Sequence, residues 1–279
     1  MPKMTIAELV QLKGKRKVTM LTAYDYPFAA ALDKAGIDMI LVGDSVANVV
    51  LGLDSTKEMT MSQMLYHAKA VRRAVKNALL IGDMPYVSYQ QDSSDRVKNA
   101  RLFVEDAGCD AVKLEWFDKA VVTAESIVKA GIPVMGHIGL TPQTADELGG
   151  FKVQGKDAQA AKKLIEQACR LEDIGCFSIL LECVPDKVTQ IITQKLKIPT
   201  IGIGAGPYCD GQVLVTHDLL GLFDRYSPKF VKRYADLKQN MITAFEQYKR
   251  DVEEGRFPTQ EHSYKITSQE LEKLLDEGV

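Results

Sequence analysis

Three acidic residues, Asp44, Asp83 and Glu115, each close a short and nearly continuous run of apolar residues. A single acid in such a position commonly caps the following helix or pairs with a neighbour. Three in succession favour a shared ion instead. Hard oxygen ligands without histidine or cysteine suit Mg²⁺, and Mn²⁺ or Co²⁺ could replace it in a site of this type. The three carboxylates therefore predict a metal site.

Two further residues extend this group. Glu182 closes an apolar run two strands further along, so it can act as a base instead of a ligand. Lys113 alternates with Glu115, so on a strand both side chains point to the same side. With several acids nearby the lysine amine should stay protonated. A role as a clamp for a substrate carboxylate is therefore favoured, with Schiff-base chemistry as the alternative.

The elements that must position these residues are eight short apolar runs that alternate with amphipathic, helix-like stretches. The runs are rich in β-branched residues and leucine, which suits strands buried on both faces of a parallel sheet. Eight strand–helix units close a (β/α)₈ TIM barrel, whose active site lies at the C-terminal ends of the strands. The alternative is an open doubly wound sheet, which would need a dinucleotide fingerprint that the sequence lacks. The runs span residues 17–25, 39–45, 79–85, 111–116, 132–140, 177–183, 198–206 and 212–218.

The remaining segments predict helices around this barrel. Residues 4–13 are expected to form a short helix that plugs the barrel bottom, and residues 92–108 one of the outer helices. A long polar helix is expected over 227–255. We assign residues 1–255 to a single barrel domain that includes the N-terminal helix. Residues 256–279 form an acidic helical tail, which is typical of a solvated or subunit-contacting segment.

Composition narrows the function classes. Apolar residues make up 46% and charged residues 26% of the 279 residues, the balance of a globular protein with a real core. The net charge of −2 gives no basic excess of the kind that nucleic-acid binding requires. The five cysteines and four histidines lack disulfide-framework or zinc spacing. Because no apolar run could span a membrane and no signal peptide precedes the first strand, we expect a cytoplasmic protein.

Taken together, the motifs resemble the ketopantoate hydroxymethyltransferase (3-methyl-2-oxobutanoate hydroxymethyltransferase) family. They follow the order of that family through most of the expected barrel. The matching stretches are TAYD (22–25), LVGDSVANVVLG (41–52), IGDMP (81–85), AVKLE (111–115), GHIGLTPQ (136–143), VQGK (153–156), LLECVP (180–185) and IGIGAGPYCDGQVLVTHD (201–218).

The resemblance implies a metal-dependent barrel of the phosphoenolpyruvate/pyruvate-binding type. It implies transfer of a one-carbon unit from 5,10-methylenetetrahydrofolate to 3-methyl-2-oxobutanoate, giving 2-dehydropantoate in the first step of pantothenate synthesis. Glu182 would be the proton acceptor, and the protein would form a homo-oligomer, a decamer by family resemblance. The magnesium positions would be Asp44, Asp83 and Glu115. The residues around the ketoacid would be Asp44, Ser45, Asp83 and Lys113.

The residues fit such a reaction chemically. A 2-oxo acid chelates Mg²⁺ through its carboxylate and keto oxygen, and the cation stabilises the enolate that forms when the C3 proton leaves. Lys113 and Ser45 could hold the substrate carboxylate, while His137 could bond a substrate oxygen or a metal-bound water, or simply pack in the core. Two alternatives stay open: a magnesium-dependent lyase or mutase of the same barrel type acting on another 2-oxo acid, and a non-catalytic binding barrel.

Overall fold

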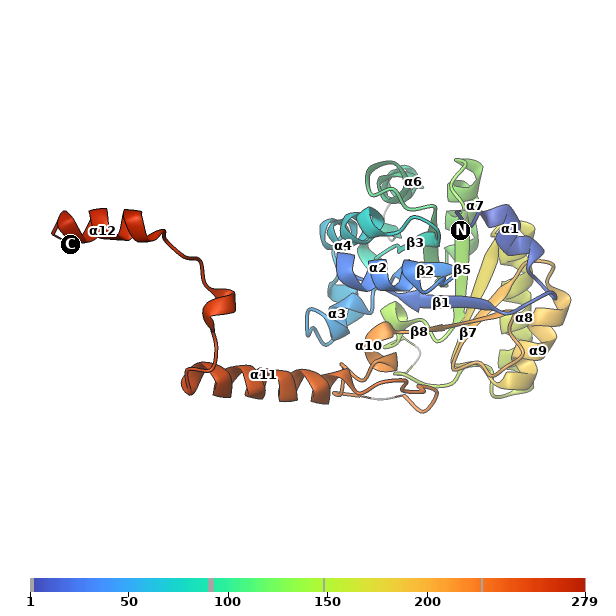
Figure 1. The fold of residues 1–279 in the computed structure, drawn as a ribbon. Helices are drawn as coiled ribbons and strands as arrows, with labels where there is room; N and C mark the ends of the chain where they lie inside the picture. Colours follow the sequence, from blue (N-terminus) through green and yellow to red (C-terminus); the bar gives the residue numbers. More distant parts are fainter. Residues whose placement is uncertain (1–2, 90–92, 148, 227, 279) are drawn as a thin grey trace.

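The computed structural model describes residues 3–89, 93–147, 149–226 and 228–278, and its centre is a closed barrel of eight parallel strands (Figure 1). Each strand pairs with the next along the chain, and β8 pairs with β1 to close the ring. The (β/α)₈ prediction is confirmed. The strands are β1 (Val18–Thr22), β2 (Met39–Val42), β3 (Leu79–Asp83), β4 (Ala111–Glu115), β5 (Val134–Gly139), β6 (Ser178–Glu182), β7 (Thr200–Ile203) and β8 (Gly211–Leu214).

Helices cover the outside of the barrel, and side chains cap several of their first turns. Thr60 accepts the backbone N–H of Gln63, and Asp157 accepts that of Ala160, so each satisfies a helix donor that would otherwise lack a partner. The covering helices are α2 (Tyr26–Lys34), α3 (Val46–Val49), α4 (Met61–Ala74), α5 (Tyr86–Tyr89), α6 (Ser93–Arg101), α7 (Ala120–Lys129), α8 (Ala158–Asp173), α9 (Asp186–Lys195) and α10 (Thr216–Leu219), with short 3₁₀ turns η1 (Thr56–Glu58) and η3 (Pro142–Thr144).

The helix expected over 92–108 is not a uniform α-helix, and residue 92 lies outside the described residues. After α6 the chain widens into a π-helical turn, η2 (Leu102–Asp106). This turn sets the buried Phe103 ring directly over Gly82 of β3, where any side chain would collide with it. The wider turn thus accompanies a close helix–strand contact that periodicity alone does not reveal.

The strands alternate between two apolar layers. Outward side chains such as Leu80 and Val112 pack against the helices, while inward ones such as Ile81 and Ala111 fill the barrel interior. Above that inner layer, toward the C-terminal strand ends, the inward face turns polar. The period of two residues therefore directs one set of side chains to the mouth: Asp83, Lys113, Glu115, His137 and Glu182.

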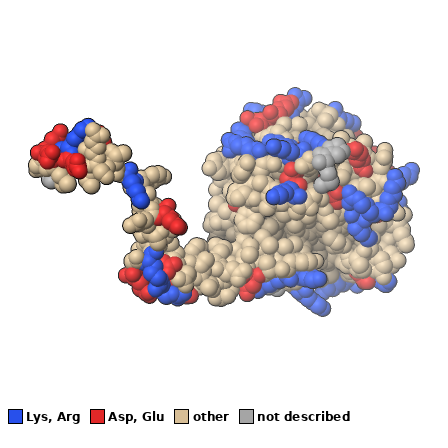
Figure 2. Space-filling model, viewed as in Figure 1, with Lys and Arg blue, Asp and Glu red and all other residues tan. Residues whose placement is uncertain are grey.

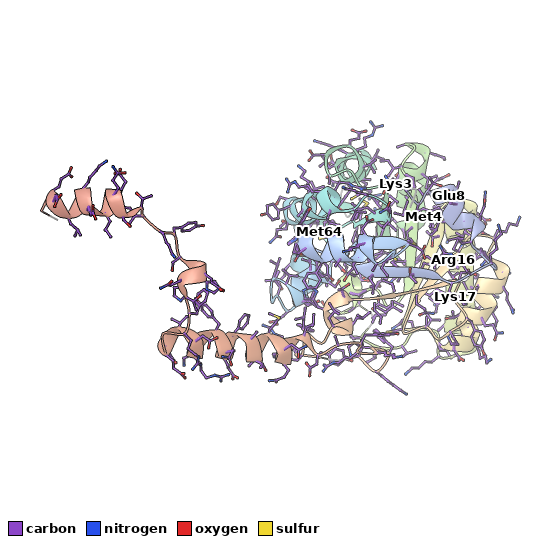
Figure 3. The ribbon with its side chains drawn as sticks, viewed as in Figure 1. Lys3, Met4, Glu8, Arg16, Lys17 and Met64 are labelled. Atoms are coloured by element: carbon purple, nitrogen blue, oxygen red, sulfur yellow. The ribbon has the colours of Figure 1, made fainter. Side chains whose placement is uncertain are left out.

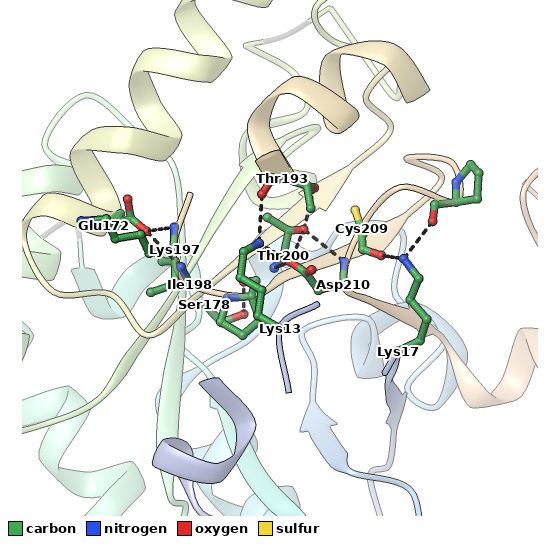
Figure 4. A network of polar contacts seen from close by, with 12 residues as sticks. Lys13, Lys17, Glu172, Ser178, Thr193, Lys197, Ile198, Thr200, Cys209 and Asp210 are labelled. Atoms are coloured by element: carbon green, nitrogen blue, oxygen red, sulfur yellow. Dashed lines mark hydrogen bonds and ion pairs between the residues drawn. The ribbon is translucent and has the colours of Figure 1, made fainter. Parts of the chain in front are cut away.

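The N-terminal segment closes the opposite end, as expected for residues 4–13. Helix α1 (Ile6–Gln11) buries Leu9 fully against the inner apolar layer. Lys13 Nζ then lies 2.6 Å from Asp210 Oδ2, and Lys17 donates to the backbone oxygen of Cys209 (Figure 4). These contacts tie the plug to the start of β8, so the site must open at the other end of the barrel.

The C-terminal segment leaves the barrel as an extended arm (Figure 1). The helix expected over 227–255 begins only at Leu237, and residue 227 lies outside the described residues. The backbone N–H groups of Tyr234 and Leu237 donate to the backbone oxygens of Leu219 and Leu220 (2.8 and 2.9 Å). The segment before Leu237 therefore packs against the end of α10 instead of forming a helix. The arm, residues 237–278, comprises α11 (Leu237–Glu253), η4 (Gln260–His262) and α12 (Ser268–Asp276).

No described residue of the arm's three helical segments is buried. Its side chains project into solvent on all sides (Figure 3), and much of its surface is uncharged (Figure 2). The boundary between a domain at 1–255 and a tail at 256–279 stays a prediction. In the structure, the chain leaves the barrel before that boundary, at the start of α11. Within the described ranges, no helix has the length and apolar character needed to cross a bilayer.

Candidate active site

The polar residues expected at the strand ends lie together inside the barrel mouth. Asp83, Lys113, Glu115 and His137 are at most 2% exposed, and the Glu182 side chain is 16% exposed. Adjacent strands in register explain the grouping, since Asp83 aligns with Lys113 and Glu115 with His137. The sequence-based expectation that these side chains converge is confirmed.

Lys113 lies at the centre of the group. Its Nζ is 2.8 Å from Asp83 Oδ1, 3.7 Å from Glu115 Oε1 and 3.1 Å from His137 Nδ1. Burial opposes the charge, but the neighbouring carboxylates outweigh it and raise the pKa of the ammonium above its ordinary value. A protonated amine is not a nucleophile, so this environment favours a clamp for an anion over Schiff-base chemistry.

His137 connects Lys113 to Glu182. Because the ammonium can only donate, His137 Nδ1 must accept from it, and the neutral ring carries its proton on Nε2. That nitrogen lies 3.3 Å from Glu182 Oε2. Burial and the Lys113 charge lower the pKa of His137, which keeps the ring neutral. His137 therefore presents an N–H toward Glu182 instead of serving only as core packing.

Glu182 and Glu115 are carboxyl groups in a low-dielectric setting. Burial raises the pKa of Glu182 above its ordinary value, and His137 opposes this only in part. Burial raises the pKa of Glu115 to about 8, and that of Asp83 well above the normal range. Each of these groups thus holds a proton more tightly than a carboxyl in water, which gives a base useful strength near neutral pH.

Asp44 joins the group from the loop after β2. Its backbone N–H donates to Asp83 Oδ2 at 3.0 Å, while its own Oδ2 is buried without a hydrogen-bond partner among the described residues. Glu115 Oε1 also lacks a hydrogen bond there. Four carboxylates, those of Asp44, Asp83, Glu115 and Glu182, thus surround one ammonium. Buried acids gathered in this way are compensated either by bound protons, as their raised pKa values indicate, or by a cation.

The residues present fit a hard divalent cation. In the described part of the chain, no three histidine, cysteine or acidic side chains lie close enough together to hold a metal ion, so Asp44, Asp83 and Glu115 do not form a ready three-carboxylate site. Mg²⁺ does not need one, because it binds through one or two carboxylates and fills its shell with water and substrate oxygens. Asp44 Oδ2 and Glu115 Oε1, which accept no hydrogen bond from the described residues, are suitable ligand atoms of this kind.

Ser45 and three residues that the strand-end pattern missed complete the site. Ser45 Oγ lies 2.8 Å from the buried Tyr24 hydroxyl. The backbone N–H of Gln143 donates to Glu115 Oε2 at 3.1 Å, and the Tyr89 hydroxyl donates to the Gln143 amide oxygen. Tyr24 and Gln143 lie within the TAYD and GHIGLTPQ motifs, which are signals that they matter, but their partners lie in distant parts of the chain.

Comparison with known proteins agrees with this geometry. The family model described as ketopantoate hydroxymethyltransferase matches residues 3–260. A relative from Syntrophomonas wolfei, a 3-methyl-2-oxobutanoate hydroxymethyltransferase, is 53% identical over 262 residues, covering 94% of this chain and 95% of its own length. The chain belongs to the ketopantoate hydroxymethyltransferase family. It is therefore a member of a family of transferases, as the sequence motifs predicted.

Solved structures with the same fold are more distant. Phosphonopyruvate hydrolase in complex with oxalate and Mg++ has a TM-score of 0.60 at 13% identity, covering 99% of this chain and 96% of the other. 2,3-Dimethylmalate lyase, a member of the PEP mutase/isocitrate lyase superfamily, has a TM-score of 0.58 at 15% identity, covering 98% and 95%. At these identities the similarities show a shared barrel fold alone.

Proposed function

We propose that this protein transfers a hydroxymethyl group to 3-methyl-2-oxobutanoate, with 5,10-methylenetetrahydrofolate as the one-carbon donor, to give 2-dehydropantoate in the first step of pantothenate synthesis. The observation that carries the proposal is the chain of contacts from Lys113 through His137 to Glu182, beside carboxylates with unpaired oxygens. This arrangement offers an anion clamp, a base and a cation site within one mouth.

The cation site is assigned to Asp44, Asp83 and Glu115, with Mg²⁺ as the metal and Mn²⁺ or Co²⁺ as substitutes. The support for this assignment is that Asp44 Oδ2 and Glu115 Oε1 are buried and accept no hydrogen bond from the described residues. Phosphonopyruvate hydrolase, which shares the fold, is known in complex with oxalate and Mg++. Oxalate carries neighbouring carboxylate oxygens much as a 2-oxo acid does. When bound, the cation would polarise the keto group of the substrate.

Lys113 and Ser45 are assigned to the substrate carboxylate, with Asp44 and Asp83 beside the ketoacid. The raised pKa of Lys113 keeps its positive charge in place. Ser45 Oγ, held 2.8 Å from Tyr24, supplies a hydroxyl at the same mouth. Because the Lys113 ammonium is already buried, binding the substrate carboxylate costs it little further desolvation. The fixed position of the ammonium then orients that carboxylate for the reaction.

Glu182 is assigned as the base that removes the C3 proton. Burial raises its pKa, which strengthens it as a proton acceptor, and His137 Nε2 faces Oε2 at 3.3 Å. Loss of the proton leaves the electron pair on C3, which attacks the methylene carbon carried by the folate. The bond between the methylene carbon and the folate nitrogen then breaks, and its electron pair stays on that nitrogen. One water molecule is consumed overall: its oxygen and one of its protons become the new hydroxyl group, while its other proton and the C3 proton end on the two folate nitrogens. Tetrahydrofolate leaves as the second product.

We further propose a cytoplasmic homo-oligomer, with a decamer as the expected size. The arm supports an assembly, because α11 exposes Phe245 and Tyr248 by more than 60% and buries nothing. A helix with an apolar stripe gains stability only when another surface covers that stripe.

The direct test is to assay 2-dehydropantoate formation from both substrates, with and without EDTA. Metal-dependent product formation, restored by added Mg²⁺, is the expected result. Cleavage or rearrangement of a different 2-oxo acid without any use of folate would favour a lyase or mutase of the same barrel type. Ketoacid binding without turnover under all metal conditions would favour a binding barrel. Either outcome would contradict the proposed transfer.

A further inference from the structure

A cavity of about 410 Å³ opens beside the barrel mouth, outside the group of charged residues. It lies between the loop after β4, the loop after β5 and the first half of α8. Trp116 and Phe117 form one part of its wall, and Lys163 on α8 forms another. Its volume falls in the range of cavities that hold small organic ligands, about 300–1,000 Å³.

The wall of this cavity is attached to the backbone that carries Glu182. Gly139, which lines the cavity, pairs with Glu182 across the β5–β6 register, and a Cβ at Gly139 would collide with the Glu182 backbone oxygen. Gln154, another lining residue, donates its backbone N–H to the oxygen of Cys183 at 2.8 Å. The cavity wall is therefore built on backbone that contacts the segment carrying the base.

The chemistry of the wall changes from one side to the other. Trp116 and Phe117 are half-buried aromatic rings, and Phe117 packs on Tyr89 with ring centroids 4.9 Å apart, so its position is fixed from behind. Lys163 is an exposed cation on α8. A ligand that fits both features has a flat apolar or heteroaromatic body and an anionic end.

We infer that this cavity binds the folate co-substrate, with its rings against Trp116 and Phe117 and a carboxylate of its glutamate tail at Lys163. The inference rests on the proposed function. The ketoacid is small and its polar groups are accounted for inside the mouth by residues such as Lys113. The second substrate is large, flat and anionic at one end, and it must approach C3 from beside Glu182.

Charge reversal at two neighbouring lysines tests this inference. Lys163→Glu should raise the KM for methylenetetrahydrofolate about tenfold and leave the KM for the ketoacid unchanged, because one ion pair is lost. Lys162→Glu is the matched control on the same helix, since Lys162 is also exposed but pairs with Glu166 instead of lining the cavity. Equal folate KM values for the two variants would overturn the inference.

Fluorescence gives a second readout without turnover. Trp116 is the only tryptophan of the chain, so its emission reports on the cavity alone. Added tetrahydrofolate should quench it, beyond the inner-filter effect measured with free N-acetyltryptophanamide. Ala160→Phe, which fills the cavity from α8, should abolish the quenching and raise the folate KM. Quenching and KM equal to wild type in a folded Ala160→Phe variant would overturn the inference.

Failure of this inference is distinct from failure of the proposed function. Wild-type protein alone tests the function, through formation of 2-dehydropantoate. The variants test only where the folate lies. If the wild type forms product while Lys163→Glu and Ala160→Phe keep the wild-type folate KM, the function stands and the cavity assignment is wrong.

Discussion

At the barrel mouth, four carboxylates are buried around one ammonium, whereas the arm exposes apolar side chains along both of its α-helices. Both regions depart from the usual rule that charges face water and apolar groups face the core. At the mouth, ion pairs and the register between strands hold the buried charged side chains in position. In the arm, nothing within the described chain covers the apolar groups.

The difference teaches what each region lacks. A buried carboxylate without a partner is costly until a cation or a proton compensates it, so the mouth indicates a metal and an anionic substrate. An exposed apolar stripe is costly until a surface covers it, so the arm indicates a protein partner. The stripe residues follow helical spacing on α11 and α12: Met241, Ile242, Phe245, Tyr248, Val252, Leu271, Leu274 and Leu275.

The largest effect is expected from Asp44→Ala. Removing a carboxylate with an unpaired oxygen should lower transfer activity by about 10³-fold or more, because the cation and the keto group lose several kcal/mol of stabilisation. The barrel should stay folded, since Asp44 lies above the packed inner layer. Asp54→Ala, in the segment after α3, is the control, because its side chain is fully exposed. Near-normal turnover of Asp44→Ala in a Mg²⁺ titration would refute the metal assignment.

The matching change in the arm is Phe245→Asp. A charge in the middle of the apolar stripe should weaken assembly by at least about 30-fold, the effect typical of an interface hot spot. The thermal midpoint of the barrel should change little, because Phe245 touches no core residue. Light scattering across protein concentrations measures this. A wild-type protein that is monomeric at micromolar concentration would contradict the proposed oligomer.

A smaller effect is expected at His137. His137→Leu should slow exchange of the substrate C3 proton about tenfold, because Glu182 loses the N–H that orients it. His137→Gln should restore part of the rate, since an amide can accept from Lys113 and donate to Glu182. His262→Leu in the arm, where the histidine is exposed, is the control. Equal rates for the Leu and Gln variants would indicate a purely structural role.

The smallest effect is expected in the pH profile of proton exchange, whose acid limb should lie at a higher pH than an ordinary glutamate would give. A base works only when deprotonated, so activity should fall as the pH drops through the pKa of Glu182. Burial raises that pKa, which moves the acid limb above the ordinary glutamate value of about 4.3. The pH profile of C3 proton exchange measures it. A limb at the ordinary value would mean that Glu182 is solvated during the reaction or is not the base.

Much of the fold and of the candidate site can be predicted from the sequence, because two local rules determine them. Apolar runs separated by amphipathic stretches specify a parallel barrel, and alternation along a strand directs Lys113 and Glu115 to the same interior. The mouth then follows from strand ends alone. For the same reason, the sequence alone predicts the residues most central to the proposed chemistry.

The rest depends on contacts between distant segments. Gln143 reaches Glu115 from a loop whose path is set by tertiary packing, and no local pattern predicts that hydrogen bond. The π turn at Phe103 and the late start of α11 at Leu237 likewise follow from contacts with Gly82 and Leu220. Periodicity favours regular helices in both places, and tertiary contacts override it.

Exchange of the C3 hydrogen of 3-methyl-2-oxobutanoate with D₂O, followed by proton NMR in the absence of folate, tests the central claim most directly. Proton removal needs only the ketoacid, Mg²⁺ and the base, so wild-type protein should catalyse the exchange. Glu182→Gln keeps the shape of the side chain but removes its basic oxygen, and the rate should fall by roughly 10²–10⁴-fold while ketoacid binding persists. Unchanged exchange in Glu182→Gln would contradict the account and assign the proton to another group.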